Sequence, residues 1–391
     1  MRLSSTELLA TLVAFDTTSR HSNLALVEWV ANYLSDLGIV PRLIHNADRS
    51  KANLFATIGP LEAGGICLHG HTDVVPVDGQ SWQSDPFQLS ERDGRLFGRG
   101  TCDMKAWLAC SLAAAQDYRP GQLRTPIQLA LSYDEEVGCL GAPSLIAALG
   151  NGLPKPSVVL VGEPSLMAPI SAHKGIIALD TTITGRDAHA SLLHLGVSAL
   201  SAAAEMAAEL ATIAGEWLNQ PGPAGMVPSG PTISVGQLHA GVARNIIARQ
   251  AQLAWELRFR ASDDADQLLA AAEARVQSRL RRVFADRFSE LTIVTREVVR
   301  VPAFDAGSDG LAERLACSWG AVSPARGVPY GAEAGQYAAA GMSVVICGPG
   351  SIEQAHQPNE FVATSQVADC DRFLARLGEW AREARADSNL P

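Results

Sequence analysis

The sequence predicts an α/β protein into which a second, smaller α+β domain is inserted. Helix and strand patterns alternate over the first 175 residues, and several strand patterns are continuous apolar runs, as in a sheet buried on both faces. The rhythm changes at 176–299, and the α/β pattern returns after Pro302. We therefore expect one domain from residues 1–175 and 300–391, with an inserted domain at 176–299.

The first α/β part contains both element types in turn. Asn23 is expected to cap a helix that Gly38 ends. The apolar positions of this helix are Val27, Val30, Leu34 and Leu37. Strand-like runs are expected at 53–58, 65–68, 127–132 and 157–161, and a helix at 104–116. These strands predict a mostly parallel or mixed sheet.

The inserted part has a different order of elements. Strands are expected at 176–184, 232–238, 252–259 and 291–299, with helices at 197–213 and 265–284. The stretch "NQPGPAGMVPSGP" interrupts them as a loop rich in proline and glycine. This order predicts a sandwich of strands on one side and two helices on the other. After it, "AEAGQYAAAG" reads as a helix and "SVVICG" as a strand.

The composition is that of a globular protein with a substantial core. The chain has 391 residues, of which 47% are hydrophobic and 18% charged. The net charge of −10 disfavours nucleic acid or an anionic membrane as the main partner. The sequence has no long apolar run and no secretory signal, and its seven cysteines are scattered. We therefore expect a cytoplasmic protein with reduced thiols and no transmembrane helix.

Five clusters of polar residues follow predicted strands or lie in loops. In "HGHTDVVPV", His71 and Asp73 share one face of a strand end, because strand side chains alternate. The other clusters contain Asp103, the run of Asp134, Glu135 and Glu136, Glu163, and His356. Ligands of open α/β sheets bind outside the carboxyl ends of the strands, so these clusters are expected to converge on one edge.

Two imidazoles and four carboxylates, without a thiolate, suit zinc, manganese or cobalt. Two metal ions that share a bridging carboxylate would use five of these groups, which leaves the sixth as a base acting on a water molecule. The neighbours Glu135 and Glu136 point in different directions and suit this division. Each cluster also has a simpler interpretation: a strand exit, a helix cap at Asp103, a turn at Glu163, or solvated loop residues. Their joint occurrence favours the metal site.

The motifs together resemble those of the dinuclear zinc amidohydrolase and peptidase family, which includes acetylornithine deacetylase, succinyl-diaminopimelate desuccinylase, aminoacylases and glutamate carboxypeptidase. The resemblance covers nearly the whole chain and rests on "GHTDVVP", "GRGTCDMK", "YDEEVGCLGA", "GEPS", "AHKG", "GRDAHAS", "RNII" and "GPGSIEQAHQPNEF". Three stretches, "DEEVGCLGA", "YGAEAG" and "CGPGSIEQAHQP", look most like acetylornithine deacetylase. The resemblance implies an α/β/α catalytic domain of the zinc-peptidase type and an inserted lid that forms a dimer surface.

The resemblance also implies a ligand set. His71 and Glu163 would bind one zinc ion, Glu136 and His356 would bind the other, and Asp103 would bridge them. Cobalt or manganese are possible substitutes for zinc.

Further roles follow from the same resemblance. Asp73 would orient His71, and His69 would not be a ligand. Glu135 would be the general base and then the proton donor to the leaving amine. His189 in "GRDAHAS" matches the lid histidine that reaches the partner subunit's site and hydrogen-bonds the oxyanion.

Substrate-binding positions are implied in the lid and in one loop. Asn245 and Arg258 match residues that hold the substrate carboxylate, and Gly331 lies where the substrate-binding loop approaches the ligand. The chain departs from the family at Ala190 and Ala332, where serine and threonine are common. The second departure removes a hydroxyl beside the substrate.

The implied activity is hydrolysis of the amide bond of an N-acyl-L-amino acid by a homodimer. N-acetylornithine, an intermediate of arginine biosynthesis, is the first expectation. An aminoacylase or a dipeptidase of the same family is the alternative. A catalytically dead homologue that binds an amino acid is the alternative from another class, and the intact Glu135 and ligand set argue against it.

Overall fold

The computed structural model describes residues 2–118, 121–307, 310–322 and 326–383, and the chain divides into two compact units. Unit 1 contains Met1–Ala172, Ala306–Arg326 and Ala332–Pro391, and unit 2 contains His173–Asp305 and Gly327–Gly331. The sequence placed the boundaries at 175/176 and 299/300, and did not anticipate that 327–331 return to unit 2. Among the helices that the structure describes, none has the length and apolarity needed to span a membrane.

Unit 1 is built on a six-stranded sheet of order β1-β2-β6-β3-β7-β15. The strands are β1 (Pro41–His45), β2 (Ala52–Ile58), β3 (Ile66–His71), β6 (Ile127–Ser132), β7 (Val158–Pro164) and β15 (Ser343–Gly348). The neighbours among β6, β3, β7 and β15 pair in parallel, whereas β1 and β2 are antiparallel. The expected α/β class with a mixed sheet is confirmed. The carboxyl ends of the four parallel strands therefore meet at one edge of the sheet.

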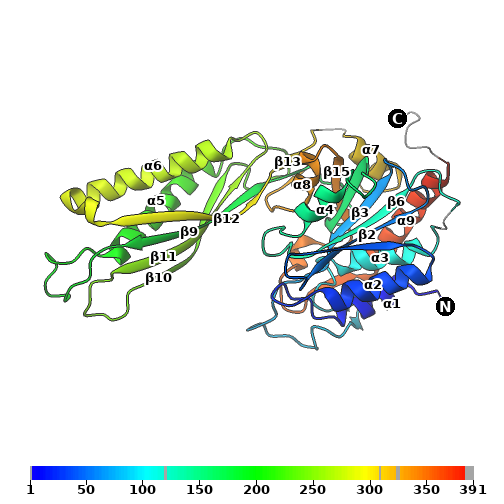
Figure 1. The fold of residues 1–391 in the computed structure, drawn as a ribbon, viewed down its shortest axis with the longest axis horizontal. Coiled ribbons are helices and arrows are strands. Elements are labelled where there is room, and N and C mark those ends of the chain that lie inside the picture. The colour runs from blue at the N-terminus through cyan, green and yellow to red at the C-terminus, as the bar shows by residue number, and fades with distance from the viewer. Residues whose placement is uncertain (1, 119–120, 308–309, 323–325, 384–391) are drawn as a thin grey trace. The chain divides into compact units, whose positions relative to one another are not determined.

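Helices cover both faces of this sheet (Figure 1). A β-carbon on Gly70 of β3 would meet Met104 and Leu108, so this residue faces α3, whereas the preceding residue, His69, contacts Tyr337 of α8. Successive strand residues point to opposite faces, so α3 and α8 lie on opposite sides. The helices are α1 (Ser5–Val13), α2 (Leu24–Asp36), α3 (Lys105–Ala115), α4 (Ala142–Ala148), α7 (Leu311–Ser318), α8 (Ala334–Ala339) and α9 (Thr364–Glu383).

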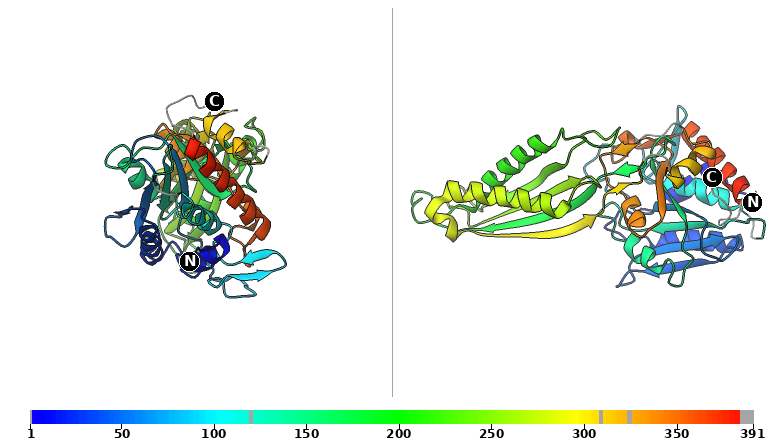
Figure 2. Two further views of the ribbon diagram at one scale, coloured as in Figure 1. Left: turned by 90° about the vertical axis from the view of Figure 1, so that its right-hand side faces the viewer. Right: turned by 90° about the horizontal axis from the view of Figure 1, so that it is seen from above.

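Two features of unit 1 differ from expectation. The side chain of Asn23 does not cap α2; it hydrogen-bonds both backbone groups of Ala52 and the hydroxyl of Thr72. The long-range partners outcompete the local cap, so that prediction was wrong. A second sheet, of β16 (Phe361–Ala363), β5 (Arg95–Phe97) and β4 (Ser90–Arg92), was not predicted and lies apart from the main one (Figure 2).

Unit 2 has an antiparallel sheet of order β10-β11-β9-β12. Its elements are β9 (Gly175–Thr184), α5 (Ala199–Trp217), β10 (Thr232–Ala240), β11 (Gln250–Phe259), α6 (Ala265–Phe284), η1 (Ala285–Glu290) and β12 (Thr292–Val301). Both helices lie on the same face of the sheet, as Figure 1 shows, and Trp255 and Leu257 of β11 share their core with Met206 of α5. Short strands β8 (Ala172–His173), β13 (Phe304–Asp305) and β14 (Gly327–Val328) form a further small sheet.

Candidate metal centre

Unit 1 brings six of the predicted side chains to the carboxyl edge of its main sheet. His71 is the last residue of β3, and Glu163 is the penultimate residue of β7. Glu135 and Glu136 follow β6, Asp103 lies just before α3, and His356 lies in the loop after β15. His71, Asp103 and Glu163 are buried, Glu135 and Glu136 are partly buried, and His356 is exposed.

Asp103 lies between the two imidazoles. Its Oδ1 is 3.0 Å from Nε2 of His71, and its Oδ2 is 3.3 Å from Nε2 of His356. Nε2 of His71 is also 3.8 Å from Oε1 of Glu163, and Nε2 of His356 is 3.0 Å from Oε2 of Glu136. Each histidine therefore shares Asp103 and has one glutamate of its own.

The pKa values of the cluster reflect buried, mutually repelling carboxylates. Burial, and then the Asp103 carboxylate, raise the pKa of Glu136 to about 7 and that of Glu163 well above its ordinary value. Burial also acts to raise the pKa of Asp103, but hydrogen bonds from His356 and His71 hold it well below the ordinary value. Hydrogen bonds to Asp103 and Glu136 raise the pKa of His356 to about 11.

The residues present fit divalent metal ions. Ligand atoms of His71, Glu135 and Glu163 lie within 4.8 Å of one another, as do those of His71, Asp103 and Glu136. Within the described residues, Oε1 of Glu136 is buried without a hydrogen-bond partner. Buried carboxylates and an unsatisfied oxygen are unfavourable unless cations compensate them, and imidazole and carboxylate are suitable ligands for zinc.

The tautomer of His71 also suits a metal ligand. Its Nδ1 is 2.9 Å from the backbone oxygen of Asp73, which can only accept, so Nδ1 carries a proton. Nε2, which faces Asp103 and Glu163, then offers its lone pair when the ring is neutral. The Asp73 carboxylate is farther away, with Oδ1 at 3.6 Å from Nδ1. Asp73 therefore meets His71 chiefly through its backbone.

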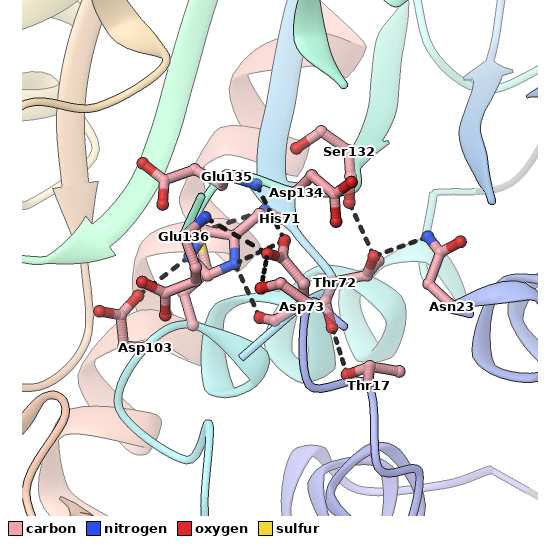
Figure 3. A network of polar contacts seen from close by, with 12 residues as sticks. Thr17, Asn23, His71, Thr72, Asp73, Asp103, Ser132, Asp134, Glu135 and Glu136 are labelled. Carbon is pink, nitrogen blue, oxygen red and sulfur yellow. Dashed lines mark hydrogen bonds and ion pairs between the residues drawn. The ribbon is translucent and has the colours of Figure 1, made fainter. Parts of the chain in front are cut away.

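The Asp73 carboxylate holds the loop that carries Glu135 and Glu136. The backbone N–H groups of these two residues donate to its Oδ1 and Oδ2 at 3.1 and 3.3 Å, and the Ser19 hydroxyl donates to Oδ2 at 2.6 Å. Figure 3 shows Asp73 beneath this loop and beside His71. The sequence did not indicate Ser19, which lies 54 residues away from Asp73.

Glu135, the predicted base, belongs to the same cluster. Burial raises its pKa well above the ordinary value; His71 opposes this, and Glu136 and Glu333 add to it. The Cys139 thiol lies 3.5 Å from its Oε1. Because Glu135 is also among the clustered ligand atoms, its role as base rather than ligand rests on the family resemblance.

His69 is buried in a network that the sequence did not predict. Its Nε2 is 2.5 Å from Oε2 of Glu333, and its Nδ1 is 2.9 Å from the Tyr337 hydroxyl. The Ser132 hydroxyl donates to the same Glu333 oxygen at 2.8 Å. His69 thus joins β3 to α8 and its preceding loop, which is a structural role. Its only sequence signal is its position two residues before His71.

The predicted lid residues lie in unit 2. His189 and Asn245 are exposed on adjacent segments, where the backbone N–H of Ala190 donates to the backbone oxygen of Asn245 at 2.9 Å. The Ser191 N–H donates to Nδ1 of His189 at 3.2 Å, so the neutral ring carries its proton on Nε2.

Arg258 and Gly331 approach the same part of unit 2. Arg258 in β11 pairs in register with Ile176, and its Nε donates to Glu256 at 2.8 Å. A β-carbon on Gly331 would lie 2.8 Å from Cδ1 of Ile176, so the loop lies close against β9 and a side chain there would require Ile176 to move. The structure thus groups the predicted residues into a metal cluster in unit 1 and four residues in unit 2.

An α/β fold with imidazole and carboxylate ligands gathered at its strand ends defines a metal-dependent hydrolase. The chain belongs to peptidase family M20/M25/M40, whose sequence profile matches residues 67–379. It is 32% identical to acetylornithine deacetylase of Myxococcus xanthus over 94% of this chain and 95% of that one, and 32% identical to acetylornithine deacetylase of Proteus mirabilis over 95% and 94%. Its fold matches a family M20 metallo-carboxypeptidase from Sulfolobus solfataricus with a TM-score of 0.73 at 16% identity, covering 97% and 99% of the chains.

Proposed function

We propose that the protein is a dinuclear zinc enzyme that hydrolyses the amide bond of an N-acyl-L-amino acid, with N-acetylornithine as the first candidate. The observation that carries this proposal is the position of Asp103, with one carboxylate oxygen toward His71 and the other toward His356. A bridging carboxylate is the device by which two ions share one site. Glu163 and Glu136 then complete the two ligand sets, and cobalt or manganese can replace zinc in such sites.

The chain supplies the proton transfer through Glu135. When bound, two zinc ions would polarise the scissile carbonyl and lower the pKa of a water molecule. Glu135 takes a proton from that water as it attacks the carbonyl carbon, and returns it to the amine nitrogen as the C–N bond breaks.

His189 is proposed to stabilise the oxyanion that forms on the carbonyl. Its Nε2 carries the proton of the neutral ring because Nδ1 accepts from Ser191, so Nε2 is a ready donor. The family resemblance assigns this donor to the site of the partner subunit. Asn245 and Arg258 are proposed to bind the substrate α-carboxylate, for which a guanidinium is well suited.

A homodimer through unit 2 is part of the proposal. β10 is an edge strand of its sheet, and edge strands pair readily with a second copy. Val242 is 90% exposed and Leu193 70% exposed beside an open hollow of about 680 Å³. Exposed apolar surface of this kind marks protein interfaces. Light scattering should give twice the chain mass, and a monomer would contradict this part.

The amino-acid specificity is the finer part of the proposal. The 32% identity to two acetylornithine deacetylases supports N-acetylornithine, and hence a place in arginine biosynthesis. Ala332, where the family commonly has threonine, keeps open an aminoacylase or dipeptidase with another amino acid. The seven cysteines without a disulfide suit the cytoplasm.

The test is a screen of N-acetyl-L-amino acids and dipeptides with zinc-loaded protein, with elemental analysis of the same sample. We expect about two equivalents of metal and release of the free amino acid, fastest from N-acetylornithine. Glu135→Ala is the negative control, because it removes the base and keeps the predicted ligands. Two bound ions without turnover of any amide would favour a catalytically dead amino-acid-binding protein.

A further inference from the structure

Asp103 and His356 are predicted metal ligands that come from loops rather than from the sheet. Asp103 ends the loop before α3, and His356 lies in the loop after η2 (Ile352–Gln354). His356 has a φ of +62°, a left-handed conformation that non-glycine residues seldom adopt. The distance between these two ligands therefore depends on what holds the loops.

A buried ion pair holds the loop of Asp103. The guanidinium of Arg99 donates from Nη1 to Oε2 of Glu360 at 2.6 Å, and both side chains are 1% exposed. Oε1 of Glu360 accepts the backbone N–H of Cys102 at 2.8 Å and that of Asp103 at 3.0 Å. Glu360 follows His356 by four residues, so its carboxylate ties the backbone of one ligand loop to the other.

The same guanidinium reaches the carbonyl of His356 through one side chain. Nη2 of Arg99 donates to Oε1 of Gln80 at 2.6 Å, and Nε2 of Gln80 donates to the backbone oxygen of His356 at 3.0 Å. Trp82 supports this arrangement, since its Nε1 also donates to Oε1 of Gln80 and its ring lies 5.1 Å from the guanidinium carbon. Gln80 thus holds the left-handed backbone of His356 in place.

We propose that Arg99 is a positioning residue that fixes Asp103 relative to His356 through Glu360 and Gln80. The network thereby sets the affinity for the divalent ion that His356 would share with Asp103. A planar guanidinium presents its N–H groups in a rigid fork that fixes the directions of two acceptors, whereas a lysine ammonium is a single rotatable donor centre on a flexible stem. The proposal rests on the dinuclear site of the proposed function and adds residues that touch neither the metal nor the substrate.

Gln80→Ala tests the branch to His356, because Gln80 is only partly buried and its loss should leave the fold intact. Gln83→Ala is the matched control: the side chain is exposed in the same loop, and the contact to Asn359 uses its backbone N–H. The probe is Zn²⁺ titrated into metal-free protein by calorimetry with a competing chelator, which gives two stepwise dissociation constants. Thermal unfolding checks the fold of each variant.

Gln80→Ala should weaken one of the two binding steps by about 10–100-fold, the usual effect of removing a residue that orients a ligand, and leave the other step unchanged. Gln83→Ala should keep both constants. Arg99→Lys should weaken the same step at least as much, although its burial can also lower stability. If the wild type binds two ions and Gln80→Ala gives the same two dissociation constants, this inference is overturned and the dinuclear proposal stands. Wild-type binding of fewer than two ions would overturn the dinuclear proposal and this inference together.

Discussion

Removal of the metal should make the stability of unit 1 depend on pH through Glu136. In the folded metal-free chain, burial and the Asp103 carboxylate raise the pKa of Glu136 from 4.5 to about 7. Between these values the folded state binds more protons than the unfolded state. The free energy of unfolding therefore falls as the pH rises through this window.

The size of the effect follows from the two pKa values. One unit of pKa difference corresponds to about 1.36 kcal/mol, so a change from 4.5 to about 7 amounts to about 3 kcal/mol. The Glu136→Gln variant cannot ionise at this position. We expect it to be more stable than the metal-free wild type, with a gain that grows by about 2–3 kcal/mol between pH 5 and pH 8.

The assay is urea unfolding of chelator-treated protein, followed by circular dichroism across this pH range. A comparison of two proteins is needed because other groups act in the opposite direction: burial lowers the pKa of His173 to about 4, which favours the folded state as the pH rises. The contribution of His173 is common to both proteins and cancels. Glu62→Gln, at an exposed residue between β2 and β3, is the matched control and should show no pH-dependent gain.

Metal addition gives the second half of this test. Bound cations favour the ionised carboxylate, so Zn²⁺ should stabilise the wild type more at pH 8 than at pH 5, and should stabilise Glu136→Gln much less. A stability difference between the two metal-free proteins that is the same at pH 5 and pH 8 would refute the reasoning. It would mean that Glu136 does not face the buried Asp103 as the structure describes.

Three further results are expected. Glu135→Ala should lower kcat by about 10²–10⁴-fold and keep two bound metal ions; loss of metal would make Glu135 a ligand instead. Inactive His189→Ala and Glu135→Ala subunits, once exchanged, should regain roughly a quarter of wild-type activity, since about half the dimers mix and each has one complete site; no recovery would place His189 in its own chain's site or in none. Gly162→Ala should lower the free energy of unfolding by about 3 kcal/mol or more, because its β-carbon would collide with Trp107. Gly215→Ala in α5, which has open space around it, should raise that free energy by about 0.5–1 kcal/mol, and thermal unfolding measures both.

The strand-end clusters could be predicted because their signals are local. The apolar runs before His71 and Glu163 mark strands, and a polar residue directly after such a run must lie at the strand end. The alternation of helices with these strands then predicts parallel pairing, which brings the ends to one edge. The spacing of apolar residues also predicted the strands and helices of unit 2, whose bounds lie close to the expected ones.

The residues that hold the cluster could not be predicted in this way. Glu360 accepts the N–H of Asp103 across 257 positions of sequence, and Glu333 meets His69 across 264. No periodicity or turn signal connects residues so far apart. The predicted helix cap at Asn23 was wrong for the same reason, because the distant backbone groups of Ala52 competed with the local cap for its side chain.

The two kinds of support imply that the two metal positions differ in rigidity. His71 and Glu163 lie on β3 and β7, which are hydrogen-bonded neighbours within a buried sheet. His356 lies on a loop, where its backbone has a left-handed conformation. A hydrogen bond from Gln80 to its backbone oxygen holds this conformation. We therefore expect His71 and Glu163 to retain their ion under mild chelation. The ion at His356 is expected to dissociate first. Because the proposed reaction uses both ions, activity should fall while the ion at His71 and Glu163 is still bound.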